Sequence, residues 1–289
     1  MKNYRKLYLQ SITKKADVKK PLKVVFDCSN GTTSAVFKGL KIKNVKLIFI
    51  NNKLDGNFPA HGPNPLEPGA MKQVEKAVVK NEADLGAVFD GDADRVFFID
   101  NKGRFLPSYV TAHLLAMAHK PPFVADIFTF NPLIYMGTKK RLYPSRVGYY
   151  FMSKTAKRHK ASFGAEWSNH YSFRETYYAD SALLAAIRVM NILSKLPYSL
   201  ADFFDLLPDF HYEQFNKKTG NPSALMKKIV KVYQKRVTKR SRLDGYLFDF
   251  REWFLIVRPS NTEPLLRLFV GSRNKKIFRR ELKKLKSLS

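Results

Sequence analysis

The chain has 289 residues, of which 52 are lysine or arginine and 24 are aspartate or glutamate, so its formal net charge at pH 7 is +28. Hydrophobic residues make up 45% of the sequence, which is enough to build a core and excludes wholesale disorder. The single cysteine, Cys28, excludes an internal disulfide framework and a zinc site made of several cysteines. This length predicts two or three domains.

Two features of the sequence bear on location and partners. No run of residues matches the roughly 18 uninterrupted apolar residues of a membrane span, and the basic start MKNYRKLYLQSITKK lacks the apolar segment of a secretory signal. We therefore expect a cytoplasmic protein with no membrane segment, and a lone cysteine agrees with a reducing compartment. A pI near 10.0 favours anionic partners, such as nucleic acid, anionic membrane surfaces or phosphorylated small molecules.

In the N-terminal third, short apolar runs alternate with amphipathic stretches. Residues 22–26 (LKVVF) predict a buried strand, which runs into a polar, glycine-containing turn at 27–33. Strand and helix alternating at this spacing is typical of α/β units with a parallel or mixed sheet. The elements expected here are strands at 22–26, 45–50, 85–89 and 96–100, helices at 34–40 and 68–81, and a proline-rich loop at 55–65.

The alternation continues through the middle of the chain, where the order of elements is compatible with a repeat of the first α/β unit, and changes after Pro208. Asp180 is expected to be the N-cap of a long helix whose Leu183, Ile187 and Met190 share one face. Beyond Pro208 the pattern is typical of an α+β unit. The expected elements are strands at 123–130, 245–250, 253–257 and 265–270, one more strand near 161–163, and helices after 180, at 223–237 and within the basic stretches 227–242 and 273–286.

Three carboxylates, those of Asp90, Asp92 and Asp94, lie between two predicted strands in the segment DGDADR. Such crowding of negative charge is costly unless a cation neutralises it. An EF-hand loop would need glycine at its sixth position and glutamate at its twelfth, where this sequence has Arg95 and Asn101. Hard oxygen ligands in a small loop therefore favour Mg²⁺, and an acidic, solvated turn is the alternative interpretation.

A second polar segment, RPSNTEP, separates two strand-like runs near the C-terminus. A guanidinium group, two hydroxyls, an amide and the N–H groups of a turn suit a phosphate dianion. An ordinary polar hairpin loop is the alternative, because serine, asparagine, threonine and proline are common turn residues. The candidate phosphate-binding residues are Arg258, Ser260, Asn261, Thr262 and Arg267.

A third segment, GAEWSNH, places Glu166, Ser168 and His170 two residues apart. An extended backbone would present all three side chains on one side, where a carboxylate, a hydroxyl and an imidazole suit sugar hydroxyls. A serine-hydrolase site is not indicated, because the sequence has no G-x-S-x-G segment. Ser168 and His170 as a capping or core pair is the alternative.

With these motifs in this order, the sequence resembles the α-D-phosphohexomutase superfamily, specifically its phosphomannomutase/phosphoglucomutase branch, along nearly the whole chain. The resemblance implies two phosphohexomutase-type α/β domains, at 1–104 and 105–208, followed by a smaller C-terminal α+β domain at 209–289. The segments that carry it are LKVVFDCSNG, DGNFPAHGPNP, DGDADR, RVGYYFM, GAEWSNH and RPSNTEPLLRL.

The resemblance also implies an activity. Members of the family interconvert hexose 1-phosphate and hexose 6-phosphate through a bisphosphate intermediate, with a phosphoserine as phosphoryl donor. By similarity, the three aspartates would hold Mg²⁺ and Arg95 would stabilise the transferring phosphoryl group. Glu166, Ser168 and His170 would bind the sugar hydroxyls. The residues expected to hold the other phosphate are Arg258, Ser260, Asn261, Thr262 and Arg267.

The sequence departs from the family in several places. The phosphoserine loop, which resembles T-A-S-H-N-P in the family's first domain, has no counterpart here, so we expect this chain alone to be inactive or weak. A separate chain could carry the phosphoserine domain, the start could be mis-set, or the domain could be lost. Asn169 replaces a glycine and is expected to distort its loop, and Gly271 stands where an acidic residue often follows the last strand.

Three functional readings therefore stay open on the sequence alone. The first is a phosphohexomutase, with mannose or glucose phosphate as substrate. The second is a sugar-phosphate-binding pseudoenzyme or one subunit of a split enzyme. The third is a basic protein that binds nucleic acid or another polyanion, which the +28 charge favours and the absence of any nucleic-acid motif opposes.

Overall fold

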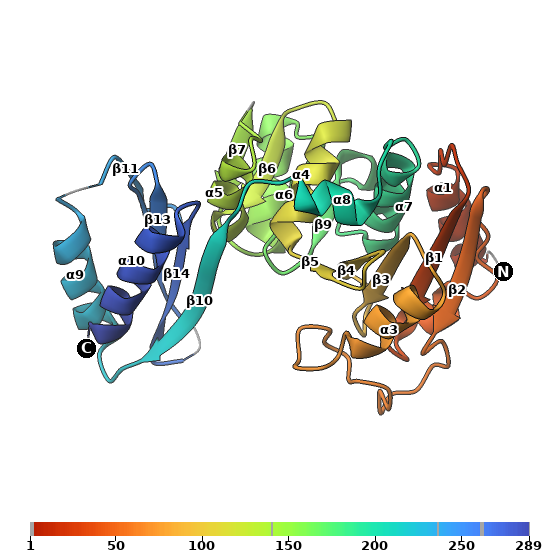
Figure 1. Ribbon diagram of the computed structural model, residues 1–289, viewed down its shortest axis with the longest axis horizontal. Coiled ribbons are helices and arrows are strands. Elements are labelled where there is room, and N and C mark those ends of the chain that lie inside the picture. Colours follow the sequence, from red (N-terminus) through yellow and green to blue (C-terminus); the bar gives the residue numbers. More distant parts are fainter. Residues whose placement is uncertain (1–2, 140, 236, 261–262, 289) are drawn as a thin grey trace.

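The computed structural model describes residues 3–139, 141–235, 237–260 and 263–288. Within these ranges the strands form three sheets, and the units built on them lie in a row along the long axis of the molecule (Figure 1). The N-terminal unit lies at one end of the row and the C-terminal unit at the other. In the described part of the chain, no helix combines the length and the apolar content needed to cross a membrane.

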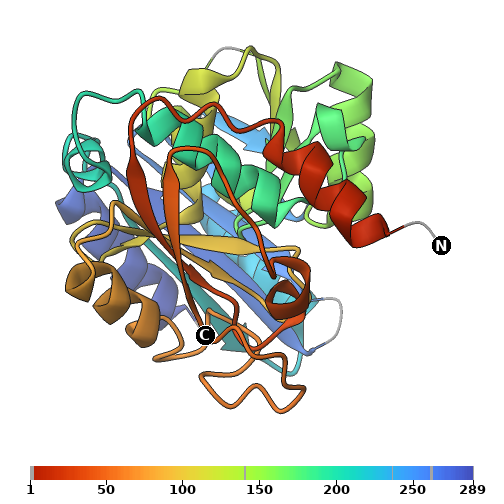
Figure 2. The same ribbon diagram turned by 90° about the vertical axis from the view of Figure 1, so that its right-hand side faces the viewer.

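The first sheet is mixed, and both of its faces are covered. Its strand order is β2–β1–β3–β4–β5, with β1 parallel to β2 and β3 and the other pairs antiparallel. Alternate residues face opposite sides, so Val25 and Val88 pack against α3 while Phe26 and Phe89 belong to the core shared with α7 (Ala182–Leu193). Helices lie on both faces of this sheet (Figure 2). The strands are β1 (Leu22–Asp27), β2 (Val45–Ile50), β3 (Leu85–Phe89), β4 (Val96–Asp100) and β5 (Phe105–Leu106), and the helices of this unit are α1 (Tyr4–Thr13), α2 (Thr32–Val36) and α3 (Lys72–Lys80).

The second sheet repeats the topology of the first. Its order is β7–β6–β8–β9, with β6 parallel to β7 and β8, and β8 antiparallel to β9. The strands β6 to β9 thus correspond in order and direction to β1 to β4, as the order of predicted elements indicated. The strands are β6 (Phe123–Asp126), β7 (Leu142–Ser145), β8 (Phe163–Ala165) and β9 (Tyr171–Phe173), and the helices are α4 (Ser108–Ala118), α5 (Ile127–Tyr135), α6 (Tyr149–His159), α7 (Ala182–Leu193) and α8 (Leu200–Asp205), with a 3-10 turn at Arg174–Thr176.

The C-terminal sheet is antiparallel throughout, in the order β10–β14–β13–β12–β11. One face carries Trp253, Leu255 and Val257 and packs against α9 and α10. The other face carries Phe254 and Phe269, which join the core of the neighbouring unit. The elements are β10 (His211–Lys218), α9 (Pro222–Tyr233), β11 (Lys239–Ser241), β12 (Tyr246–Asp249), β13 (Trp253–Pro259), β14 (Leu265–Ser272) and α10 (Lys275–Ser287).

The structure corrects three predicted elements. The strand expected at 123–130 ends at Asp126, because its carboxylate accepts a 2.7 Å hydrogen bond from the Thr129 amide and starts α5. The basic stretch 227–242 is helical only as far as Tyr233 and includes a strand at its end. The N-cap of α7 is Ser181 and not Asp180.

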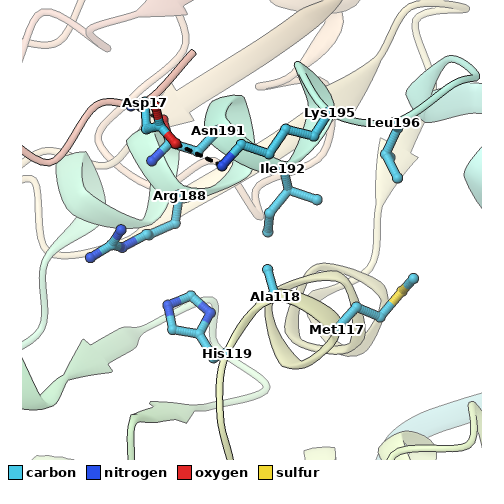
Figure 3. Close-up of a pocket in the computed structure, with 9 residues that line it drawn as sticks. All are labelled: Asp17, Met117, Ala118, His119, Arg188, Asn191, Ile192, Lys195 and Leu196. Carbon is cyan, nitrogen blue, oxygen red and sulfur yellow. Dashed lines mark hydrogen bonds and ion pairs between the residues drawn. The ribbon is translucent and has the colours of Figure 1, made fainter. Parts of the chain in front are cut away.

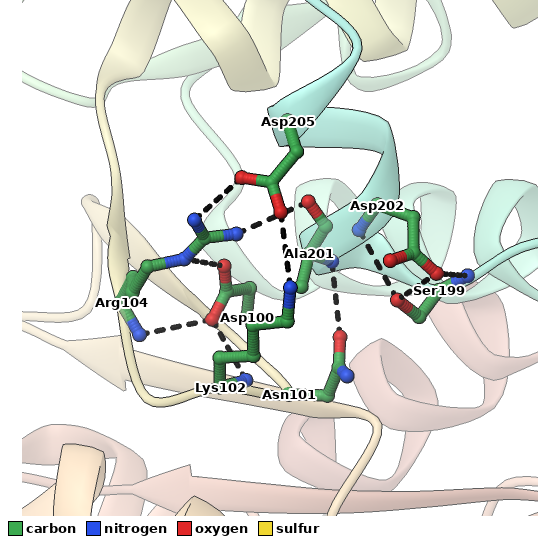
Figure 4. A network of polar contacts seen from close by, with 8 residues as sticks. All are labelled: Asp100, Asn101, Lys102, Arg104, Ser199, Ala201, Asp202 and Asp205. Carbon is green, nitrogen blue, oxygen red and sulfur yellow. Dashed lines mark hydrogen bonds and ion pairs between the residues drawn. The ribbon is translucent and has the colours of Figure 1, made fainter.

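A polar network joins the first sheet to the second unit (Figure 4). The fully buried Asp100 accepts hydrogen bonds from the backbone amides of Lys102 and Arg104, both at 2.9 Å, and from Arg104 Nε at 2.7 Å. The same guanidinium reaches Asp205 Oδ1 on α8 at 2.5 Å and the carbonyl oxygen of Ala201 at 3.1 Å. The turn after β4 is therefore held against α8, in addition to the apolar core that the first sheet shares with α7.

Candidate active site

The acidic loop, residues 90–95, connects β3 to β4 and brings the three predicted carboxylates together. One ligand atom from each of Asp90, Asp92 and Asp94 lies within 4.8 Å of the others. Asp90 is buried, Asp94 is partly exposed and Asp92 is exposed. The loop curls through Ala93, whose φ of 70° lies in the left-handed region. The convergence expected from the spacing is therefore present in the structure.

Arg95 compensates the charge of this loop from within. Its Nε lies 2.5 Å from Asp90 Oδ2, and its backbone amide donates to Asp90 Oδ1 at 3.1 Å. The guanidinium also contacts Asn64 Oδ1 at 3.4 Å, and the Gly91 amide donates to the carbonyl oxygen of Pro63 at 2.9 Å. The acidic loop thus packs against the proline-rich loop at 55–65.

The 166–170 loop connects β8 to β9, the position that corresponds to the acidic loop in the repeated topology. It is a tight turn and not the extended segment that was predicted, because the Asn169 amide bonds back to the carbonyl oxygen of Glu166 at 3.0 Å. Ser168 Oγ and His170 Nδ1 lie 2.7 Å apart. The Glu166 carboxylate points elsewhere and accepts a 3.1 Å hydrogen bond from the Gly148 amide.

Asn169 keeps the backbone conformation that a glycine would allow. Its φ is 69°, and asparagine is one of the few residues that adopt this left-handed region readily. Its side chain is buried and accepts a hydrogen bond from the Tyr171 hydroxyl at 3.2 Å. The added side chain is therefore absorbed into the core beneath the loop.

The acidic loop and the 166–170 loop meet directly. His170 Nε2 lies 3.2 Å from Asp94 Oδ2, and the Val96 amide donates to the Asn169 carbonyl oxygen at 3.4 Å. Arg95 and His170 also form an isolated antiparallel bridge. The two repeated units thus bring their equivalent loops to one place, with carboxylates on one side and an imidazole on the other.

Burial alters the protonation of the acids around this contact. Burial, and next the charge of Asp126, raise the pKa of Glu166 to about 8. Burial also raises the pKa of Asp126 to about 6, and it raises the pKa of Asp180 against the opposing effect of His170. Sequence reasoning missed Asp126 and assigned Asp180 to a helix cap. A position at the end of a parallel strand could have pointed to Asp126.

Arg258 and Arg267 form a pair on the C-terminal sheet. They are directly opposite in the antiparallel register of β13 and β14, on the face that carries Phe254 and Phe269. Arg258 Nε pairs with Asp244 Oδ1 at 2.9 Å, while the buried Nε of Arg267 has no hydrogen-bond partner among the described residues. Like charges opposite one another are unfavourable, so an anion would relieve the pair.

The remaining predicted phosphate-binding residues follow β13. Ser260 Oγ accepts from the Glu263 amide at 3.3 Å, and its backbone amide bonds to the Leu265 carbonyl oxygen. Asn261 and Thr262 lie outside the described residues.

A cavity of about 390 Å³ opens elsewhere, between α7 and the C-terminal end of α4 (Figure 3). Its two cations are already paired, Lys195 with Asp17 at 2.8 Å and Arg188 with Glu175. Its lining is mainly apolar and each of its two cations has a carboxylate partner, although the buried Nε of Arg188 has no hydrogen-bond partner among the described residues. We therefore do not assign the anion site to this cavity.

Sequence models of one family match most of the chain. The Phosphoglucomutase/phosphomannomutase models match as alpha/beta/alpha domain II at residues 6–103, alpha/beta/alpha domain III at 133–210 and the C-terminal domain at 213–286. The chain belongs to the α-D-phosphohexomutase superfamily. It has two α/β units of the phosphohexomutase type followed by a C-terminal α+β unit.

Curated phosphohexomutase relatives match over a large share of the chain. The phosphomannomutase of Salmonella typhimurium is 31% identical, over 88% of this chain and 59% of that protein. The phosphomannomutase of Methanocaldococcus jannaschii is 31% identical, over 100% of this chain and 65% of that protein. The chain thus spans about three fifths of the length of the curated relatives it matches.

The fold is also shared with solved structures. A phosphoglucomutase/phosphomannomutase family protein from Burkholderia thailandensis superposes with a TM-score of 0.83 at 21% identity, over 98% of this chain and 65% of that one. A putative phosphomannomutase from Thermus thermophilus gives a TM-score of 0.76 at 16% identity, over 98% of this chain and 66% of that one. These similarities concern the fold.

Proposed function

We propose that this chain carries the metal- and substrate-binding part of a phosphohexomutase that interconverts mannose or glucose 1-phosphate and 6-phosphate through a bisphosphate intermediate. The meeting of the two loops carries the proposal, because the 3.2 Å contact between Asp94 and His170 puts metal-type ligands beside sugar-type ligands. The C-terminal sheet reaches the same 166–170 loop, since the rings of Trp167 and Phe269 are 4.7 Å apart. The arginine pair lies on that face of the sheet.

The acidic loop fits a divalent cation by the chemistry of its donors. Three carboxylates with ligand atoms within 4.8 Å of one another supply the hard oxygen atoms that Mg²⁺ prefers. We assign Asp90, Asp92 and Asp94 to holding it, and a bound Mg²⁺ would neutralise charge on a phosphoryl group. Arg95, held by Asp90, is assigned to stabilising the negative charge of the transferring phosphoryl group.

The 166–170 loop and the predicted phosphate-binding residues of the C-terminal unit would bind the substrate. A carboxyl group with a pKa near 8 is protonated at neutral pH, so Glu166 can donate a hydrogen bond to a sugar oxygen. Ser168 and His170, 2.7 Å apart, offer a further hydroxyl and imidazole. We assign the phosphate that is not transferred to the residues predicted from the sequence, Arg258, Ser260, Asn261, Thr262 and Arg267.

Two further parts of the proposal concern organisation. We propose domain boundaries at 104/105 and 208/209, although β5 at Phe105–Leu106 still pairs with β4 of the first sheet. We propose that the phosphoryl donor is a phosphoserine outside the motifs of this sequence, on a domain supplied by a separate chain or joined to this one.

The test is a calorimetric titration of the purified chain with mannose 1-phosphate and glucose 1-phosphate in the presence of Mg²⁺. We expect saturable binding that Arg258→Ala and His170→Ala each weaken by about tenfold or more, because each removes a charged or polar contact to the ligand. The matched control is Arg240→Ala, which removes an exposed arginine from the edge strand β11 of the same sheet.

Two outcomes would contradict the proposal. Equal weakening by Arg240→Ala would show that general positive charge, and not the arginine pair, attracts the sugar phosphate. Binding of duplex DNA that is not displaced by hexose phosphate, together with no heat from the sugar phosphates, would favour a polyanion-binding protein.

A further inference from the structure

We propose that Asp244 is a positioning residue that couples the phosphate-binding Arg258 to the 166–170 loop across the boundary between two units. Its carboxylate has two partners on different elements. Oδ1 lies 2.9 Å from Arg258 Nε on β13, and Oδ2 accepts a 3.1 Å hydrogen bond from the Val147 amide, which precedes α6. The inference rests on the proposed function, because it assigns Arg258 to a phosphate.

Gly148, the residue after Val147, extends this connection to Glu166, which we assign to the sugar hydroxyls. The Gly148 amide, adjacent to that of Val147, donates to Glu166 Oε2 at 3.1 Å. Two consecutive backbone amides thus donate hydrogen bonds to two carboxylates, that of Asp244 from the C-terminal unit and that of Glu166 from the 166–170 loop. The path from Arg258 to Glu166 consists of Asp244 and one dipeptide, so a displacement of Asp244 reaches both binding residues.

The local backbone is built to bring Asp244 to this place. Gly245 has a φ of 81°, and a Cβ atom there would lie 2.5 Å from the Val257 carbonyl oxygen. Only glycine fits so close an approach at this φ, so the turn between β11 and β12 is held against the end of β13 beside Arg258. Asp244 has a side-chain exposure of 8%, which shields its two contacts from water.

The carboxylate does not serve its own turn. Aspartate in a turn commonly bonds a backbone amide two residues on, and such a bond would explain it locally. Here that task falls to Ser241, whose hydroxyl accepts from the Leu243 amide at 3.2 Å. One oxygen atom of Asp244 contacts β13 and the other accepts from the Val147 amide. The side chain therefore stabilises the contact with the neighbouring unit and not its own turn.

Coupling matters for a ligand that has a phosphate at one end and hydroxyl groups at the other. Such a ligand must touch Arg258 and Glu166 together, and correct spacing between them strengthens its binding. Inorganic phosphate can follow the arginine wherever it lies, because it has no second anchor. We therefore expect Asp244→Ala to weaken mannose 1-phosphate about tenfold while changing inorganic phosphate less than about threefold.

The experiment has two arms and a matched control. Hydrogen exchange in the ligand-free chain should show faster exchange of the Val147 and Gly148 amides in Asp244→Ala, because one of their acceptors is gone. Calorimetry should show the selective loss for mannose 1-phosphate. The control is Asp249→Asn in the same sheet, whose carboxylate accepts a 2.9 Å hydrogen bond from the nearby Arg251 amide and which should change neither readout.

Asp244→Asn keeps the volume of the side chain and serves as the second variant if the alanine protein does not fold. In it, a double-mutant cycle between Arg258→Ala and Glu166→Gln should become additive, whereas in the wild-type background the two should couple. Equal weakening of both ligands, tighter phosphate binding, no change in affinity or persistent coupling would each overturn the inference.

The two proposals fail in different ways. A wild-type chain that binds no hexose phosphate would overturn the proposed function. The exchange arm needs no ligand, so unchanged exchange at Val147 and Gly148 in Asp244→Ala would by itself overturn the link through Asp244.

Discussion

Charged side chains hold the turn after β4 against α8, whereas aromatic rings hold the C-terminal sheet against α4 and the 166–170 loop. At the first junction, the guanidinium of Arg104 joins Asp100 to Asp205. At the second, Trp167 stacks on Tyr109 with centroids 6.0 Å apart and meets Phe269 at 4.7 Å. The candidate site depends on both, because its loops come from all three units.

The two kinds of contact constrain movement differently. Hydrogen bonds to a guanidinium need fixed directions, so the first junction has one good arrangement. Ring contacts scale with buried area and accept several tilts, so the second junction holds the sheet close without fixing its angle as strictly. The Asp244 contact to Val147 adds a directional bond there.

Asp100→Ala is the strongest way to break the polar junction. It removes the buried acceptor of two backbone amides and of Arg104 Nε, and we expect it to lower the free energy of unfolding by about 3–4 kcal/mol. Urea denaturation of the variant and the wild type measures the change. A loss below about 1 kcal/mol would mean that this junction is not held by its network.

Trp167→Ala tests the aromatic junction in the same way. It removes the ring that contacts Tyr109, Tyr212 and Phe269, and we expect a loss of about 3 kcal/mol, at the lower end for tryptophan because the side chain is partly exposed. Leu206→Ala, which truncates an exposed apolar side chain near the same boundary, should stay within about 0.5 kcal/mol. Equal losses for both would remove the distinction.

The pH dependence of stability tests the protonation of Glu166 in the 166–170 loop. The folded chain keeps the proton of Glu166 up to a pKa of about 8, whereas the unfolded chain releases it near pH 4.3. The contribution of this group to the free energy of unfolding is therefore greatest at low pH and falls as the pH rises. Between pH 5 and 7 we expect the wild type to lose about 2 kcal/mol more than Glu166→Gln, which cannot ionise. Parallel curves would mean that Glu166 is ionised throughout.

Mg²⁺ bound to the acidic loop should stabilise the folded chain. At a Mg²⁺ concentration ten times its dissociation constant, binding to the folded chain alone raises the free energy of unfolding by about 1.4 kcal/mol. Asp92→Asn should remove this gain with little effect on metal-free stability, because Asp92 is exposed. Thermal unfolding with Mg²⁺ and with a chelator measures both, and a gain that survives the substitution would place the metal elsewhere.

The smallest effect belongs to the exposed end of the polar network. Lys102 Nζ lies 3.0 Å from Asp205 Oδ2, but both side chains are about half exposed, at 53% and 45%. We expect Lys102→Ala to cost less than about 0.5 kcal/mol. A loss comparable to that of Asp100→Ala would show that the network acts as one unit and that the effect of a substitution in it does not depend on how buried the residue is.

Much of the fold could be read from local patterns. The apolar runs at β2, β3 and β4 have strong strand character and clear turns on either side, and their bounds were predicted as observed. β10 was missed because its exposed alternate residues are polar, with a sequence of HYEQFNKK. The run at 123–130 was read as one strand because apolar periodicity does not separate a buried strand from a buried helix.

The candidate site was predictable where its residues are adjacent in sequence and hidden where the fold assembles it. The convergence of Asp90, Asp92 and Asp94 follows from their spacing. Asp180 and Asp244 come to the site from segments far from the acidic loop, and only tertiary structure shows what their carboxylates face. The direction of Glu166 was also out of reach, because it depends on the Gly148 amide.

The chain contains two tryptophans, and the fold distributes them between its two kinds of packing. Trp253 lies in the outer core of the C-terminal sheet, with its ring 4.0 Å from that of Phe250, while Trp167 lies in the aromatic junction. In a Trp253→Phe protein all indole emission comes from the junction. Separation of the C-terminal sheet from the 166–170 loop would expose Trp167 to water and move its emission to longer wavelength. The fluorescence of Trp167 therefore reports whether this junction is intact.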